Sequence, residues 1–189
     1  MSELSSVCVY AASTPGPTSA FAAAAGALGR TLAEAGITVV FGGGRAGLMG
    51  ALADAALAAG GDVVGVIPDF LDARELTHRG VSELHVVASM HERKTLMAER
   101  ADAFVALPGG IGTLEELVEV MTWSQLGLLP RPIGLLDVDD FWAPFTHLIA
   151  HLDAHGFIRE QTRGMLHRED DPAALLAALR GPSAAPPAA

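Results

Sequence analysis

The stretch Phe104-Val-Ala-Leu-Pro-Gly-Gly-Ile-Gly-Thr-Leu-Glu-Glu-Leu-Val-Glu119 decides the fold of this chain. An apolar run from Ala103 to Leu107 ends at Pro108, which is typical of a short buried strand. Three glycines follow within four residues, and an amphipathic helical pattern starts at Thr113. We therefore expect a strand, a tight loop and the start of a helix.

The glycine loop in this stretch is suited to hold an anion. Glycines such as Gly109, Gly110 and Gly112 allow positive φ angles and a close approach of the backbone to a ligand. The first amide groups of a helix have no partner inside the helix, and the positive end of the helix dipole favours negative charge. The sequence therefore predicts a phosphate site in the loop 108–113.

Two carboxylates, Glu115 and Glu116, follow the loop by about one turn of helix. A carboxylate in that place suggests chemistry on the group that carries the phosphate. Thr113-Leu-Glu-Glu116 is also a capping-box pattern, in which Glu116 would only bond back to the helix start. A cap alone does not require three preceding glycines, so we favour the ligand-binding interpretation, and both roles of Glu116 stay open.

Apolar runs alternate with helical segments along the chain, which indicates βαβ units. We expect one α/β domain over residues 1–180, with a doubly wound, Rossmann-like parallel sheet flanked by helices on both faces, and a disordered tail over 181–189. The predicted strands are 7–11, 37–41, 62–67, 84–87, 103–107 and 133–136. The predicted helices are 18–35, 47–59, 90–101, 113–128, 140–154 and 172–179, with a loop and a short helix within 69–83.

Three loops, 13–16, 42–47 and 108–113, should meet where the strand order reverses, because ligands bind at that edge of such sheets. The second loop matches the dinucleotide fingerprint Gly-x-Gly-x-x-Gly. It follows the second strand, however, and no acidic residue ends the next strand to hold a ribose. We expect its glycines, including Gly43 and Gly44, to pack helix against sheet and to form a backbone nest near the substrate.

Composition limits the partners. A net charge of −10 disfavours nucleic acid and acidic membrane surfaces, because both attract basic faces. The uncharged segment 4–29 is interrupted by Pro15, Gly16 and Pro17, so it predicts neither a membrane helix nor a signal peptide. The single cysteine, Cys8, cannot form an intrachain disulfide, and we expect a cytoplasmic protein.

The predicted helix 90–101 begins after Ser89, a good N-cap, and carries cations in its first turn. Arg93 and Lys94 stand there against the helix dipole, which indicates an anionic partner. His91 beside them is a weaker candidate for an acid. We expect no metal site, since the seven histidines lack metal-ligand spacing, and no cofactor.

Taken in order, these motifs resemble the LOG (lonely guy) family of cytokinin riboside 5′-monophosphate phosphoribohydrolases, whose members have often been labelled lysine decarboxylases. The resemblance rests on the segments 42–50, 90–94, 101–107, 108–116 and 122–127 and covers roughly residues 7–179. One departure is Ala12, which stands where the family usually has a glycine.

The resemblance implies hydrolysis of the N-glycosidic bond of an N6-modified AMP, or of AMP, to free base and ribose 5-phosphate. It implies that Arg93 and Glu116 are catalytic, and that the protein is a homodimer. The helix with Trp123 and Gln125 is a candidate interface, although its apolar residues could equally belong to the core. The resemblance also implies that the loop 108–113 holds the 5′-phosphate. Glu115 is the alternative to Glu116 if the register of the helix points it inward. The substrate-binding residues that we expect are Ser13, Gly43, Gly44, Met90, Lys94, Pro108, Gly109, Gly110, Gly112, Thr113 and Glu115.

This chemistry agrees with the residue types. Glycosidic cleavage passes through an oxocarbenium-like state, which the carboxylate of Glu116 could stabilise, or it could orient the attacking water. Arg93 could hold phosphate or ribose hydroxyls, or stabilise the departing base.

Two other functions stay open. One is a lysine decarboxylase that uses pyridoxal phosphate, for which Lys94, the only lysine, is the sole Schiff-base candidate. The other is a nucleotide or cofactor carrier of the same fold without turnover.

Overall fold

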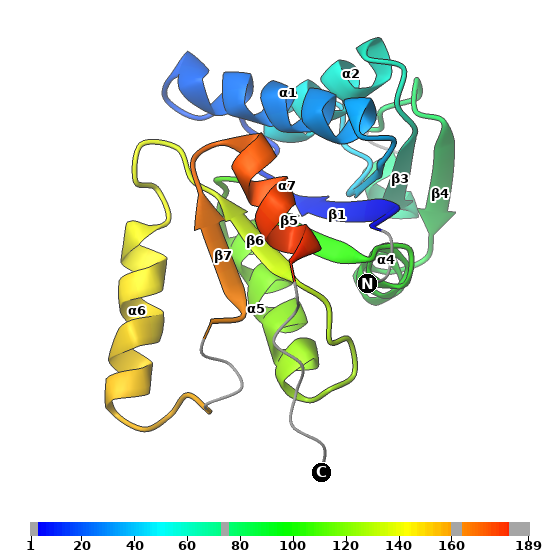
Figure 1. Cartoon of the computed structure of the whole chain (residues 1–189). Coiled ribbons are helices and arrows are strands. Elements are labelled where there is room, and N and C mark those ends of the chain that lie inside the picture. Colours follow the sequence, from blue (N-terminus) through cyan, green and yellow to red (C-terminus); the bar gives the residue numbers. More distant parts are fainter. Residues whose placement is uncertain (1–3, 73–75, 160–163, 182–189) are drawn as a thin grey trace.

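The computed structural model describes residues 4–72, 76–159 and 164–181, whose strands form one sheet (Figure 1). These strands are β1 (Ser6–Tyr10), β2 (Thr38–Phe41), β3 (Val63–Pro68), β4 (Glu83–Val87), β5 (Ala103–Ala106), β6 (Ile133–Leu136) and β7 (Leu166–Glu169). The strand order is β4-β3-β2-β1-β5-β6-β7, and every neighbouring pair is parallel. The order reverses between β1 and β5, which confirms the predicted doubly wound, Rossmann-like α/β fold.

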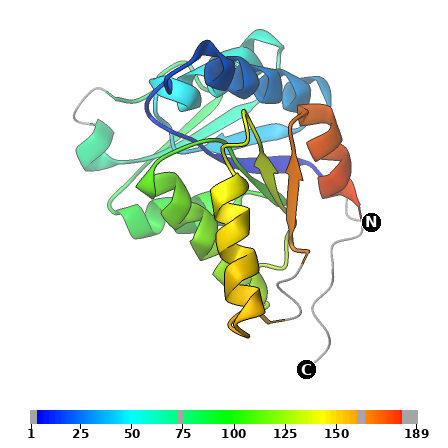
Figure 2. The same cartoon turned by 90° about the vertical axis from the view of Figure 1, so that its left-hand side faces the viewer.

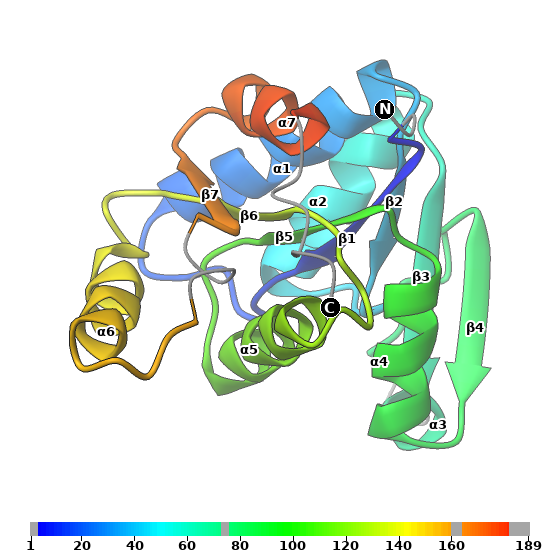
Figure 3. The same cartoon turned by 60° about the horizontal axis from the view of Figure 1, so that its bottom comes forward.

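Helices cover both faces of the sheet. They are α1 (Ser19–Glu34), α2 (Gly47–Ala58), α3 (Asp69–Asp72), α4 (Met90–Glu99), α5 (Ile111–Gln125), α6 (Ala143–Ala154) and α7 (Pro172–Arg180). Figure 3 shows α1, α2 and α7 on one face and α4, α5 and α6 on the other. Figure 2 shows the same separation, with α1 in blue opposite α5 in green and α6 in yellow. Within the described residues, no helix is both long and apolar enough to span a bilayer.

Strand β1 shows how the sequence builds two cores. Successive side chains of a strand point to opposite faces. Val7 and Val9 therefore join the core under α1, α2 and α7. Cys8 and Tyr10 join the core under α4, α5 and α6. An uninterrupted apolar run is what a strand buried on both faces requires, and all four side chains are at most 3% exposed.

Some predicted boundaries are wrong. Helix α5 begins at Ile111 with Gly110 as its N-cap, so Thr113 already lies inside the helix. Helix α6 begins at Ala143, because Asp139 and Asp140 adopt positive φ angles of 53° and 57° and end any helical path there.

Strand β7 was missed by the sequence analysis. Its residues Leu-His-Arg-Glu contain no apolar run, because an edge strand is only partly covered. The short helix predicted within 69–83 is α3. The predicted disordered tail lies outside the described residues except for Gly181, the C-cap of α7.

Helices α1 and α2 pack closely at Gly29. A Cβ atom at Gly29 would lie 2.3 Å from the carbonyl oxygen of Leu52, so only glycine fits there. One turn earlier, a Cβ atom at Gly26 would lie 3.6 Å from its nearest neighbour, the Cβ of Ala55, which is an ordinary contact.

We therefore expect opposite effects from the same substitution at two sites on α1. Gly29→Ala should lower the free energy of unfolding by about 1–3 kcal/mol, because the methyl group overpacks the interface. Gly26→Ala should raise it by about 0.5–1 kcal/mol, because alanine favours the helix. Urea denaturation monitored by circular dichroism checks both, and equal effects would contradict the packing described.

Candidate active site

The site lies at the carboxyl ends of the strands, where the loop after β1 meets the start of α2. The carbonyl oxygen of Ala12 accepts hydrogen bonds from the amides of Leu48 (3.0 Å) and Met49 (3.3 Å). Gly47 has a positive φ of 64°, and a Cβ there would lie 2.3 Å from the backbone of Ser13. The first amides of α2 are therefore used by the chain itself. This arrangement disfavours a dinucleotide phosphate at the glycine loop 42–47.

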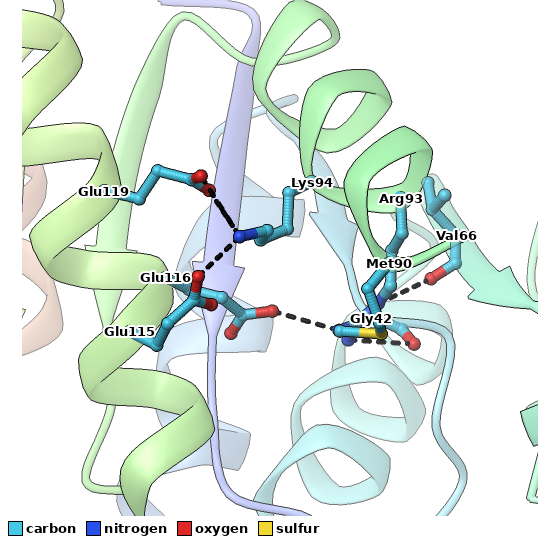
Figure 4. Close-up of polar contacts among 8 residues, drawn as sticks. All are labelled: Gly42, Val66, Met90, Arg93, Lys94, Glu115, Glu116 and Glu119. Atoms are coloured by element: carbon cyan, nitrogen blue, oxygen red, sulfur yellow. Dashed lines mark hydrogen bonds and ion pairs between the residues drawn. The ribbon is translucent and has the colours of Figure 1, made fainter.

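The glycine loop after β2 instead makes room for Arg93. A Cβ atom at Gly42 would lie 1.8 Å from a terminal nitrogen of the Arg93 guanidinium. Arg93 reaches from the first turns of α4 across the ends of β2 and β3 and is only 8% exposed. It donates hydrogen bonds to the carbonyl oxygens of Val66 (3.2 Å) and Gly42 (3.4 Å) (Figure 4). These contacts hold the guanidinium in one orientation.

The third contact of Arg93 is the carboxylate of Glu116 on α5. Nη1 of Arg93 donates to Oε1 of Glu116 over 3.1 Å, and the Glu116 residue is 7% exposed. Glu116 does not close a capping box, since Gly110, not Thr113, is the N-cap and no side chain caps the helix. Of the two roles predicted for Glu116, the structure therefore excludes the cap.

The local environment controls the charge of Glu116. Burial raises the pKa of this carboxyl, and the guanidinium of Arg93 opposes that rise. A carboxyl with a raised pKa is a stronger base than an exposed glutamate once it is ionised. Beneath it on β1, burial also raises the pKa of the Cys8 thiol and the Tyr10 phenol, which keeps both groups protonated.

The predicted phosphate loop leads directly into α5. A side chain at Gly110 or Gly112 would meet no atom within 4 Å, so the space beside these glycines is open. Gly109 has a different role, since a Cβ there would lie 2.1 Å from Oγ1 of Thr113. Thr113 is thus buried beneath the loop. Pro108, which precedes the glycines, is buried as well. The helix start that faces the open space has the amide arrangement that binds anions.

The remaining predicted site residues take different places. Met90 is the first residue of α4, and its sulfur lies 4.0 Å from Nη1 of Arg93. Ser13 and His91 are exposed, and neither is brought into the Arg93–Glu116 contact. The strand-end loop also brings Gly43 and Gly44 against the segment 76–78, since the carbonyl of Gly43 accepts from the amide of His78.

Lys94 points away from Arg93, toward two carboxylates on α5. Its ammonium lies 2.5 Å from Glu115 and 3.0 Å from Glu119 (Figure 4). Desolvation lowers the pKa of Lys94, but hydrogen bonds to the two carboxylates outweigh it and raise the pKa overall. A Schiff base needs an unprotonated amine, so this environment disfavours the decarboxylase function. Glu119 was missed by the sequence analysis, although its i+4 spacing from Glu115 places both on one helix face.

No group of three or more metal-ligating side chains occurs in the described parts of the chain. A cavity of about 620 Å³ lies at the ends of β6 and β7, away from Arg93 and Glu116. Its carboxylates would repel a phosphate. The cavity is lined by Asp137, Asp139, Asp140, Arg168, Glu169 and Asp170.

Comparison with known proteins identifies the family. A family model described as "Possible lysine decarboxylase" matches residues 49–179. The chain is 47% identical to a cytokinin riboside 5′-monophosphate phosphoribohydrolase of Rhodococcoides fascians, over 94% of this chain and 90% of the relative. The chain belongs to the LOG family. It is also 49% identical to the LOG enzyme of Oryza sativa subsp. japonica that carries the same activity name, over 85% of this chain and 66% of the relative.

Solved structures agree on the fold of this LOG family member. A molybdenum cofactor binding protein of Rippkaea orientalis superimposes with a TM-score of 0.72 at 19% identity, over 95% of this chain and 98% of that one. The molybdenum cofactor carrier protein of Chlamydomonas reinhardtii gives 0.69 at 23% identity, over 94% and 96%. At such identities the likeness concerns the fold alone.

We expect Glu116 to titrate above the ordinary glutamate value of 4.5. Arg93→Met should raise this pKa further, because the opposing cation is lost. Gly42→Ala should act in the same direction, because the added methyl displaces the guanidinium. NMR titration of the side-chain carboxyl carbons measures the shift. Arg30→Met, an exposed cation on the opposite face of the sheet, serves as the control. An unchanged Glu116 titration in Arg93→Met would contradict this account.

Proposed function

We propose that this protein hydrolyses the N-glycosidic bond of N6-modified adenosine 5′-monophosphates, and of AMP, to free base and ribose 5-phosphate. The observation that carries the proposal is the buried Arg93–Glu116 pair. It lies beside the start of α5, where no side chain caps the helix. The names of relatives at 47% and 49% identity support the same reaction and substrate class.

In the proposed reaction each group has a step. The amides at the start of α5, with Gly110 and Gly112, bind the 5′-phosphate and place the ribose over Glu116. As the bond from C1′ to N9 breaks, its electron pair leaves with the base, and the ionised Glu116 stabilises the positive charge that develops on the ribose. Glu116 then takes one proton of the water whose oxygen bonds to C1′, and this proton passes on to the departing base, so that neutral free base and ribose 5-phosphate are released and Glu116 is ionised again. Arg93 orients Glu116 and favours its ionised form.

The proposal predicts release of free base from isopentenyladenosine monophosphate and from AMP. Glu116→Gln should lower kcat by about 100- to 10,000-fold, because a general base is lost, while AMP binding persists. Adenosine, which lacks the phosphate, should have a higher KM than AMP. Chromatography of the products measures turnover, and calorimetry measures binding.

Glu34→Gln, an exposed carboxylate change on α1, is the matched control and should keep full activity. Absence of base release from both monophosphates would refute the hydrolase. Base release that Glu116→Gln does not reduce would refute the role of Glu116. Binding without turnover would identify a carrier.

We also propose a homodimer formed through the outer face of α5. Large apolar side chains are exposed along and just after this helix, including Ile111 (83%), Val118 (48%), Leu126 (58%) and Leu128 (66%). On the same side of the sheet, no residue of α6 is buried. An apolar surface of this kind on a stable protein indicates an interface, and a second copy with the same surface provides a self-complementary partner.

The dimer is tested by a charge placed in the proposed interface. Val118→Glu should shift the protein from dimer to monomer, because a carboxylate would be buried without a partner. Sedimentation velocity measures the mass in solution. Val86→Glu, an equally exposed residue (49%) on the edge strand β4, should leave the dimer intact. A monomeric wild-type protein, or a Val118→Glu dimer, would contradict the proposal.

We infer a cytoplasmic location for the enzyme. The inference is supported by Cys8, the only cysteine of the sequence, which is free and buried. A buried free thiol is suited to a reducing compartment.

A further inference from the structure

Two pairs of neighbouring residues connect α4 to α5. Arg93 on α4 contacts Glu116 on α5, and the next residue, Lys94, contacts Glu115. The ammonium of Lys94 also lies 3.0 Å from Glu119, one turn further along α5. We call Lys94, Glu115 and Glu119 the lysine bridge. Figure 4 shows it beside the Arg93–Glu116 pair, with Lys94 extending from α4 toward α5 and Arg93 directed toward Gly42 and Val66.

The lysine bridge reduces the charge repulsion between two carboxylates on α5. Glu115 and Glu119 are four residues apart, and like charges at this spacing repel on a helix. Lys94 places one cation between them, and its side chain is only 13% exposed. An ammonium has three N–H donors, and the two carboxylates accept from it at 2.5 Å and 3.1 Å. Two of the three donors of Lys94 are thus used by carboxylates of the protein itself.

The same charges act on Glu116. Arg93 and Lys94 favour its ionised form, whereas Glu115 and Glu119 disfavour it. The two cations balance the two neighbouring carboxylates as long as Lys94 is present. Without Lys94, one cation would face two carboxylates, and ionisation of Glu116 would become harder. In the described part of the chain, the titratable or charged groups that interact electrostatically with Glu116 include Arg93 and Lys94 from α4, Glu115 and Glu119 from α5, and Cys8 and Tyr10 from β1.

We infer that Lys94 and Glu119 are positioning residues for the proposed hydrolysis: their bridge holds α4 against α5 and fixes a cation beside the Arg93–Glu116 pair, and Lys94 does not bind the substrate phosphate. The inference rests on the proposed function. It assigns a role to Glu119, which the sequence did not single out, and it changes the expected role of Lys94 and Glu115 from substrate contact to support of the catalytic pair.

The test is the pH dependence of kcat/KM for AMP in Lys94→Met. Loss of the cation should move the acidic limb of the profile up by about one pH unit, because a nearby charge shifts a pKa by about that amount or more. Activity on the acidic limb should fall about tenfold, since one pH unit is one factor of ten in the ionised fraction. KM at high pH should stay close to that of the wild type.

Two further variants separate charge from mere structural support. Lys94→Arg keeps a cation in the bridge and should keep the wild-type profile. Lys94→Met combined with Glu119→Gln removes one charge of each sign. In this double variant, the acidic limb of the kcat/KM profile should return toward its wild-type position. Arg100→Met is the matched control, because Arg100 is another cation of the α4 end, paired at 3.1 Å with exposed Glu83. It should leave the profile unchanged.

The NMR titration of the Glu116 carboxyl, assigned with Glu116→Gln, gives a readout that does not need activity. The pKa of Glu116 should rise in Lys94→Met. It should return toward the wild-type value in Lys94→Met combined with Glu119→Gln. An unmoved titration overturns the inference even when the enzyme is active. A large rise of KM at every pH with an unmoved profile also overturns it, since Lys94 would then contact the substrate. If the wild-type protein releases no base, the proposed function is refuted, but the inference about Lys94 is not. The titration of Glu116 then still tests the role of Lys94.

Discussion

The ion pair of Arg93 with Glu116 is the constraint on which the rest of the site depends. Taking a guanidinium and a carboxylate out of water is costly, and removing one partner of such a pair typically costs about 3–5 kcal/mol. The protein offsets this cost with further contacts to Arg93, which donates to the carbonyl oxygens of Val66 and Gly42. Gly42 must lack a side chain for the guanidinium to fit. The glycine loop is therefore part of the support of Arg93.

The order of the strands explains why this pair forms at the centre of the sheet. Because β1 lies between β2 and β5, the ends of three strands and the start of α5 meet at one edge. Arg93 reaches this edge from α4, which follows the outermost strand β4. Glu116 reaches it from α5, which follows β5. The carboxylate and its cation thus come from separate helices, and the anion site that we propose at the start of α5 lies beside them.

The sequence predicted the elements with strong periodic signals and missed those without them. The apolar run of β1 and the glycine-terminated helices were predicted correctly, because burial on both faces and helix ends impose local patterns. The edge strand β7 has no such pattern. The start of α5 was predicted two residues late, because Thr113-x-x-Glu116 imitates a capping box. The contacts of Lys94 were not predicted, because its two carboxylate partners lie on another helix.

The local patterns of the sequence were enough to predict the doubly wound α/β fold and the glycine loop before α5, and they singled out Arg93 and Glu116 as candidate catalytic residues. These follow from local patterns of hydrophobicity, glycine and charge that each βαβ unit carries. The packing of the helices was needed to show that Glu116 faces Arg93 instead of capping α5, that Gly42 makes room for the guanidinium, and that Glu119 contacts Lys94. These contacts join groups 23 to 51 residues apart in the sequence, and their distances depend on how the helices pack across the sheet.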